Sequence, residues 1–268
     1  DTLQLGNMPV SLGDMRTSAV LLKHIGVSVL QRVDGMVLLQ AREIKNPVAP
    51  YDLVRKMRAS ILVLGPLLAR NGYAEVSLPG GCAIGTRPVD FHIEGLKAMG
   101  AEIEIESGYI KASAKNGLSG GLYRFPKVSH TGTENLMMAA TLAKGETVLE
   151  NCAREPEVAD LADCLNKMGA QIEGAGTETI RVQGVAKLHG AAHNVIADRI
   201  ETGTWMIAAG MTGGELFLEN GSLRDLQALT VLLRAADMHI DETDGGIRVT
   251  RNGMRLTGMD IMTEPHPG

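Results

Sequence analysis

A glycine-rich stretch near residue 80 carries a thiol and a guanidinium at a spacing that suits chemistry. Three glycines stand within residues 80–85, around Cys82, and Arg87 follows the cysteine by five positions. Glycine lets a backbone approach a ligand closely, a thiol can donate a proton or act as a nucleophile, and a guanidinium binds carboxylate or phosphate. The stretch therefore predicts a reactive loop that binds an anionic substrate. The alternative for Cys82 is a buried apolar filler, for which a glycine-rich loop is a poor position.

The composition of the 268-residue chain limits the partners that it can have. Aromatic residues make up 3% and the formal net charge is −5, which argues against a nucleic-acid-binding surface. No signal peptide and no apolar run of about 18 residues is visible, so we expect no membrane partner. The three cysteines form no disulfide framework, which favours the cytoplasm, and the histidines show no metal spacing. We expect neither a metal nor a cofactor.

Two short sequences recur at one spacing, which indicates an internal repeat. Lys97–Ile103 is similar to Asn166–Ile172, and Gly145–Asn151 is similar to Gly214–Asn220, each pair 69 positions apart. A helix end alone would explain the Met-Gly-Ala of the first pair, but it would not give the second pair the same spacing. Common solenoids have shorter periods, and a chain with 44% hydrophobic residues can bury more than one core.

Each repeat contains the same succession of elements. A helix rich in small residues leads into a strand that begins Gly-Glu, and an amphipathic helix and two alternating strands follow. With a strand before the first helix, the unit is βαβαββ. Such units form mixed sheets with helices on one side, around a shared core. Helices are expected at residues 133–144, 158–168 and 202–211, and strands at 170–173 and 179–183.

The repeat and the cysteine loop together resemble the enolpyruvyl transferase family over essentially the whole chain. Residues 57–60, 153–157, 197–204 and 264–267 resemble it as well. The resemblance implies an α/β fold of two inside-out α/β barrel domains, each built from three βαβαββ repeats. It places the first domain at residues 1–196 and an incomplete second domain at residues 197–268. Since the chain begins with Asp1 and lacks both ends of the family's sequences, including the expected catalytic base, we expect a fragment that is inactive alone.

Within the family, the cysteine-bearing loop is typical of the branch that works on a nucleotide sugar. The resemblance implies transfer of the enolpyruvyl group of phosphoenolpyruvate to the 3-hydroxyl of UDP-N-acetylglucosamine, with release of phosphate, in peptidoglycan synthesis. Cys82 would protonate phosphoenolpyruvate and could also add to it covalently. Arg87 would bind this substrate, and Arg58, before the apolar helical stretch 61–68, would help to hold the anions. The rivals are the branch that acts on shikimate 3-phosphate, which lacks this cysteine, and a non-catalytic nucleotide-sugar-binding protein.

Two further runs are implied to hold the nucleotide sugar. The run that resembles the uridine-contacting segment is Pro88, Val89, Asp90 and Phe91. The run that resembles the diphosphate-holding segment is Lys127, Val128, Ser129 and His130. Each run also has a structural interpretation, because Pro88 and Asp90 suit the first turn of a helix and Ser129 suits a helix cap. A helix is expected after the second run, and helix N-termini bind anions. Where this chain has His130 and Thr131 the family often has a small or aliphatic residue and a glycine, so the implied contacts there are made by the backbone.

Overall fold

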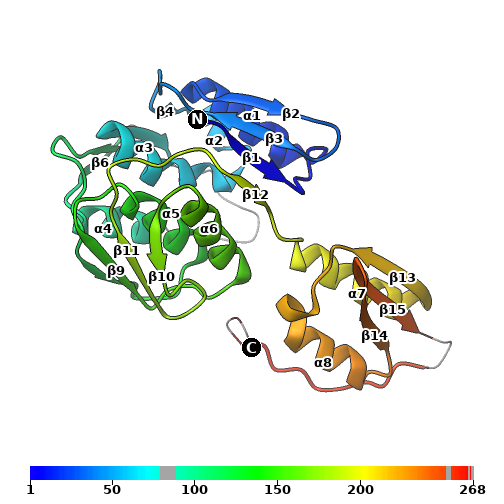
Figure 1. Ribbon diagram of the computed structural model, residues 1–268. Coiled ribbons are helices and arrows are strands. Elements are labelled where there is room, and N and C mark those ends of the chain that lie inside the picture. The colour runs from blue at the N-terminus through cyan, green and yellow to red at the C-terminus, as the bar shows by residue number, and fades with distance from the viewer. Residues whose placement is uncertain (79–88, 252–254, 265, 267–268) are drawn as a thin grey trace. The chain divides into compact units, whose positions relative to one another are not determined.

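The computed structural model describes residues 1–78, 89–251, 255–264 and 266 (Figure 1). The chain divides into two compact units, Asp1–Val195 and Ile196–Gly268. The resemblance to the enolpyruvyl transferases predicts a domain boundary after residue 196. In the part of the chain that the structure describes, no helix is long and apolar enough to cross a membrane.

Two sheets of the first unit have the same topology. One contains β4 (Val48–Ala49), β5 (Tyr73–Ser77), β7 (Tyr109–Ser113) and β6 (Glu102–Glu106), in this spatial order. The other contains β8 (Leu122–Arg124), β9 (Glu146–Glu150), β11 (Thr179–Gln183) and β10 (Gln171–Glu173). In each sheet the first two strands are parallel and the other neighbours are antiparallel.

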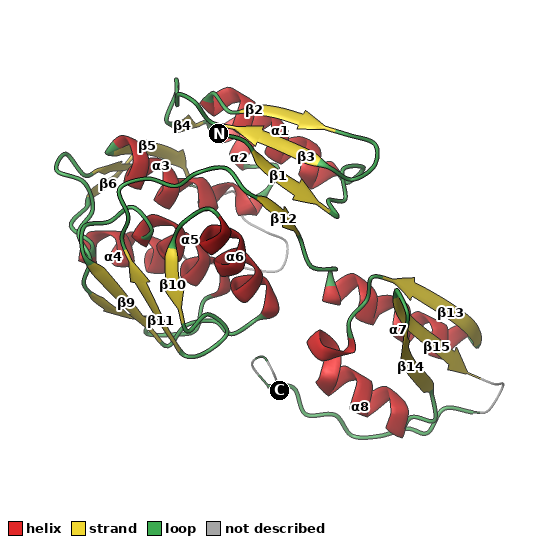
Figure 2. Ribbon diagram, viewed as in Figure 1, coloured by secondary structure: helices red, strands yellow, loops and turns green. Residues whose placement is uncertain are grey.

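Helices connect these strands in the order that the sequence predicts. Between β4 and β5 lie α2 (Tyr51–Val54), the 3-10 helix η1 (Arg58–Val63) and α3 (Leu64–Asn71), and α4 (Asp90–Ala98) precedes β6. In the next repeat, α5 (His130–Ala140) connects β8 to β9, and α6 (Pro156–Lys167) leads to β10. Both segments are complete βαβαββ units, so the predicted repeat and fold class are confirmed (Figure 2).

The third sheet of the first unit is closed by a strand from far along the chain. Its spatial order is β12 (Ala192–Asn194), β1 (Leu3–Gly6), β3 (Val37–Gln40) and β2 (Ser28–Gln31), with α1 (Gly13–Ile25) between β1 and β2. β12 pairs in parallel with β1, as β8 does with β9. The residues that follow β1 and β9 are also equivalent. Asn7 and Asn151 both have positive φ, and their side chains donate hydrogen bonds to the carbonyls of Val195 and Phe125. β12 therefore supplies the first strand of the third repeat.

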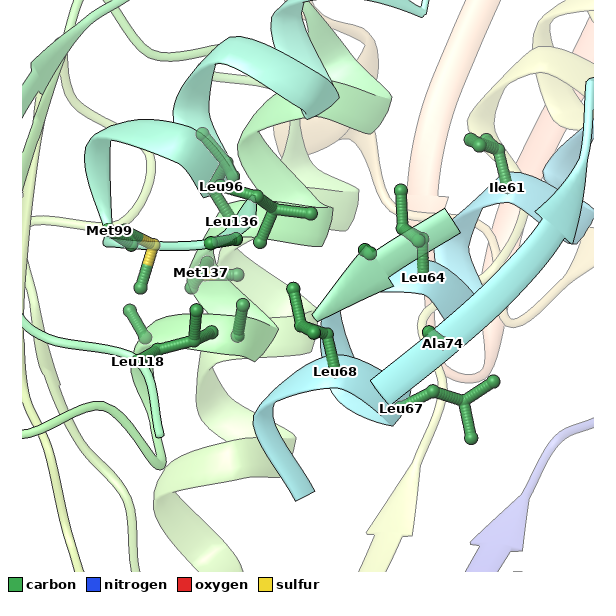
Figure 3. Packing of buried hydrophobic residues seen from close by; sticks show 14 of the residues in the cluster. Ile61, Leu64, Leu67, Leu68, Ala74, Leu96, Met99, Leu118, Leu136 and Met137 are labelled. Atoms are coloured by element: carbon green, nitrogen blue, oxygen red, sulfur yellow. The ribbon is translucent and has the colours of Figure 1, made fainter. Parts of the chain in front are cut away.

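Helix α5 lies at the centre of the hydrophobic core of the first unit. It contacts α3, α4 and α6, and Leu136 and Met137 are fully buried (Figure 3). Glycine makes two of these contacts possible: a Cβ at Gly65 would lie 2.6 Å from the carbonyl oxygen of Asn135, and one at Gly95 would lie 2.1 Å from a methyl of Leu136. The other helices and the inner faces of the sheets supply further core residues, and burial alternates along strands such as β7 and β11.

The second unit contains one further copy of the succession of elements. Helix α7 (Arg199–Thr212) leads into β13 (Gly214–Glu219), and η2 (Leu223–Leu226), α8 (Gln227–Ala235), β14 (His239–Thr243) and β15 (Gly246–Arg251) follow. The three strands pair antiparallel in the order β13-β15-β14. Their core is small and includes Met206, Ile240, Ile247 and Val249.

The predicted beginnings of two helices are wrong by three residues. Helix α5 begins at His130 rather than 133, and α7 begins at Arg199 rather than 202. In each case a capping side chain allows the earlier start: Ser129 accepts from the amide of Gly132, and Asp198 accepts from the amides of Ile200 and Glu201. The apolar stretch 61–68 is also not one helix, because a 3-10 turn over 58–63 precedes α3.

Candidate functional site

Three of the predicted site residues lie outside the described residues. These are Cys82, Arg87 and Pro88. The described residues resume at Val89, which precedes the first residue of α4 and is buried in the core. Asp90 occupies the first turn of α4 with its side chain exposed, and Phe91 is half-buried against the core. The run 89–91 therefore anchors the beginning of α4 through its two apolar members and presents a carboxylate to solvent.

The second predicted run lies at the N-terminus of α5. Lys127 and Val128 are exposed, and Ser129 caps the helix. The Ser129 carbonyl accepts hydrogen bonds from the amide and the hydroxyl of Thr133, at 2.9 and 2.8 Å. Its hydroxyl oxygen already accepts from Gly132 at 3.2 Å, so the capping interpretation of Ser129 is confirmed. The first turn of α5 carries no acidic residue, and unpaired amides at such an end attract anions.

A buried histidine connects the two predicted runs. His92, on α4, is 1% exposed, and its Nε2 lies 3.4 Å from the hydroxyl oxygen of Thr131. Its Nδ1 lies 2.8 Å from the side-chain nitrogen of Asn135, and the Asn135 oxygen accepts from the amide of Gly65 at 2.8 Å. These hydrogen bonds join α4, α5 and α3. Because α4 begins with one predicted run and α5 with the other, the structure brings the two runs together.

The charge of Arg58 acts on the same histidine. Burial and, as the smaller cause, the positive charge of Arg58 together lower the pKa of His92 to about 4. Arg58 begins the 3-10 helix η1, which contacts α5. Arg58, the run 89–91 and the beginning of α5 thus belong to one neighbourhood of the first unit.

Two carboxylates lie close to His130, the first residue of α5. Its Nε2 lies 3.6 Å from Glu134 and 3.9 Å from Glu157. Burial raises the pKa of Glu134, the charge of His130 lowers it, and the charges of Glu157 and Glu155 raise it. Glu155 Oε2 is buried and has no hydrogen-bond partner among the described residues. Negative charge therefore collects around His130, close to the beginning of α5.

The two described cysteines are unsuited to catalysis. Cys152 and Cys164 are both buried. Burial raises the pKa of Cys152 to about 12 and raises that of Cys164 as well. Their thiolate fractions at neutral pH are therefore small, and the thiolate is the reactive form.

Sequence reasoning missed the residues that connect the predicted runs. Thr131 and Asn135 are four positions apart on α5, a spacing that puts both on one face of a helix. His92 follows the run 89–91 directly. The spacing of Thr131 and Asn135 could have predicted that they share one face of the helix. Only the packing of α4 against α5 places that face opposite His92. Among the residues that the structure describes, no group of three His, Cys, Asp or Glu side chains is arranged to hold a metal ion.

Comparison with known proteins identifies the family. A family model described as EPSP synthase (3-phosphoshikimate 1-carboxyvinyltransferase) matches residues 3–268. The chain belongs to this family. Within it, relatives named UDP-N-acetylglucosamine 1-carboxyvinyltransferase from Dinoroseobacter shibae and Rhodospirillum centenum are each 55% identical to the chain and cover 100% of it. The chain spans 64% of the length of each of these relatives.

Solved structures of the family share the fold. The enolpyruvyl transferase NikO from Streptomyces tendae matches 95% of the chain with a TM-score of 0.81 and 20% identity, and the match covers 61% of NikO. EPSP synthase from Acinetobacter baumannii matches 97% of the chain with a TM-score of 0.74 and 19% identity, over 61% of that protein. The predicted resemblance to the enolpyruvyl transferases is therefore confirmed by sequence and by fold.

Proposed function

We propose that the protein to which this chain belongs transfers the enolpyruvyl group of phosphoenolpyruvate to the 3-hydroxyl of UDP-N-acetylglucosamine. The observation that carries the proposal is the 55% identity, over the whole chain, to relatives named for this reaction. The geometry agrees with it, because the beginnings of α4 and α5, which the resemblance assigns to uridine and diphosphate, are joined through His92. Both substrates are metabolites of the cytoplasm, where we expect the protein to work without a membrane or nucleic-acid partner.

The reaction requires one proton donor and several cationic or amide groups. Carbon 3 of phosphoenolpyruvate gains a proton while the sugar oxygen attacks carbon 2 and loses its own proton. The resulting ketal then loses a proton from carbon 3 and expels phosphate, which restores the double bond. We assign the first proton donation to Cys82, and the binding of phosphoenolpyruvate to Arg87 with help from Arg58. The amides at the beginning of α5 would hold the diphosphate, and the run 88–91 would contact the uridine.

The experiment measures phosphate release by the full-length protein that carries this chain. We expect release that requires both phosphoenolpyruvate and UDP-N-acetylglucosamine and that is lost in the Cys82→Ser variant. Mass spectrometry should find a phosphoenolpyruvate adduct on the peptide that contains Cys82. Full activity of Cys82→Ser would remove this residue from the mechanism.

The family model's own name points to shikimate 3-phosphate as the second candidate acceptor. Phosphate release with shikimate 3-phosphate, and none with the nucleotide sugar, would contradict our proposal in favour of that reaction. Binding of the nucleotide sugar without phosphate release would indicate a non-catalytic binding protein. Running both acceptors in parallel, with the same enzyme preparation, separates these outcomes.

A further inference from the structure

We propose that Thr131 is a binding residue for the diphosphate of the nucleotide sugar and that His92 is the positioning residue that aims its hydroxyl group. This inference rests on the proposed function and adds two residues to it. It starts from a chain of hydrogen bonds that runs from α3 through the core to the beginning of α5. In this chain every donor points the same way.

The direction of the hydrogen bonds follows from the first of them. The amide of Gly65 can only donate, so the Asn135 atom 2.8 Å from it must be the oxygen. The Asn135 nitrogen therefore faces His92, and since an amide nitrogen only donates, His92 Nδ1 must accept at 2.8 Å. A neutral imidazole then carries its hydrogen on Nε2. That hydrogen is donated to the Thr131 oxygen, at 3.4 Å.

The consequence for Thr131 is a hydroxyl whose hydrogen is not used in the contact with His92. Its oxygen accepts from His92, so its own hydrogen must be offered elsewhere. Thr131 is half-buried and lies in the first turn of α5, directly after the run 127–130 that resembles the diphosphate-holding segment. Successive hydrogen bonds that point in one direction polarise one another, which strengthens the last donor. A phosphate oxygen at the beginning of α5 would accept this hydrogen.

The neutral state of His92 is essential to this arrangement. A protonated imidazole would turn Nδ1 into a donor facing the donor Asn135, and the chain of hydrogen bonds would break. The groups packed against the ring favour the neutral form, since α5 contributes the uncharged Thr131 and Asn135 and η1 contributes the cation Arg58. Since the family often carries a glycine where Thr131 stands, the side-chain donor would add to the backbone contacts.

An ordinary core histidine is the alternative, and kinetics of the full-length protein distinguish the two. The variants are Thr131→Val, which keeps the shape of the side chain and removes the hydroxyl, and Thr131→Ser, which restores a hydroxyl. His92→Leu removes the ring donor. Thr141→Val is the matched control, because Thr141 is 1% exposed, follows α5 at its other end and donates its hydroxyl hydrogen to Met138 at 2.7 Å.

We expect Thr131→Val and His92→Leu to raise the KM for UDP-N-acetylglucosamine by about tenfold, the usual size of one lost hydrogen bond to a charged group, with kcat within about twofold. UDP should inhibit these variants more weakly than the wild type by a similar factor. Uridine, which lacks the diphosphate, should inhibit the variants and the wild type equally. Thr131→Ser should recover most of the affinity. Thr141→Val should change neither constant. Selective ¹⁵N labelling of histidine should show His92 as the Nε2–H tautomer.

Two results would overturn the inference. If the wild type turns over UDP-N-acetylglucosamine but Thr131→Val and His92→Leu match Thr141→Val in KM, the inference fails and the proposed function stands. If the wild type has no activity with the nucleotide sugar, the proposed function fails and the inference fails with it. Should His92→Leu not fold, Thr131→Val and Thr131→Ser decide the question by themselves.

Discussion

His92 makes the stability of the first unit depend on pH. Its pKa is about 4 in the folded chain and about 6.5 when the chain is unfolded, so the unfolded state binds more protons between these values. The stabilisation is therefore fully present above pH 6.5 and is lost as the pH falls towards 4. Between pH 7.5 and pH 5 we expect the free energy of unfolding to fall by about 2 kcal/mol through this group.

The measurement is urea unfolding followed by circular dichroism at both pH values, for the wild type and His92→Gln. Glutamine has no group that titrates in this range, so the variant should lose less stability than the wild type on acidification. An equal loss in both proteins would show that other groups cause the pH dependence.

The three cysteines should differ sharply in reactivity. Cys152 and Cys164 are buried with raised pKa values, so iodoacetamide at pH 7.5 should leave both unmodified in the native chain. We expect a single label, on Cys82, and labels on all three residues in denaturant. Intact-mass measurement with Cys82→Ser as the control checks this. A label on Cys152 in the native Cys82→Ser chain would contradict the burial described above.

At the level of elements, the approach of α3 to α5 depends on a missing side chain. A Cβ at Gly65 would lie 2.6 Å from the backbone oxygen of Asn135, closer than real Cβ atoms come. We expect Gly65→Ala to lower the free energy of unfolding by about 2 kcal/mol, because two helices must move apart. The control is Gly13→Ala in α1, where a Cβ meets nothing within 4 Å. Urea unfolding that shows equal effects of the two substitutions would be contrary to this packing.

The sequence predicts the succession of elements well because each copy of the repeat carries the same residue patterns that form its helices and strands. Alternating burial defines β11 at residues 179–183 as expected, and the paired markers predict the βαβαββ unit. Helix beginnings were harder to predict, because Ser129 and Asp198 could each be read as a cap or as a loop residue. The strand β12 could not be predicted from its own residues, since its partner β1 lies at the other end of the unit. The same holds for His92, whose partners come from another helix.

The two units of the chain have hydrophobic cores of unequal size. Among the described residues, thirty-five buried apolar side chains form the core of the first unit and seven form that of the second, which is about half as many relative to the length of each unit. Small units bury a smaller fraction of their surface and are correspondingly marginal. We therefore expect the second unit to unfold at a lower urea concentration than the first.

Trp205 provides the measurement, because it is the chain's one tryptophan and lies on α7 of the second unit. Its fluorescence should change at a lower urea concentration than the circular dichroism, to which the first unit contributes most of the signal. Trp205→Phe, which removes the fluorescence, serves to confirm the origin of the early transition. Coincident midpoints would instead indicate that the chain unfolds as one cooperative body.

The closing strand β12 has a consequence for synthesis on the ribosome. Asn7 and Val195, which are joined by a hydrogen bond beside this strand, are 188 positions apart. At translation rates of roughly 5–20 residues per second, one edge of β1 remains unpaired for roughly ten to forty seconds until β12 has been synthesised. Unpaired strand edges pair readily with other chains. We therefore expect a chaperone that covers β1 until β12 has left the ribosome to reduce aggregation of the nascent chain.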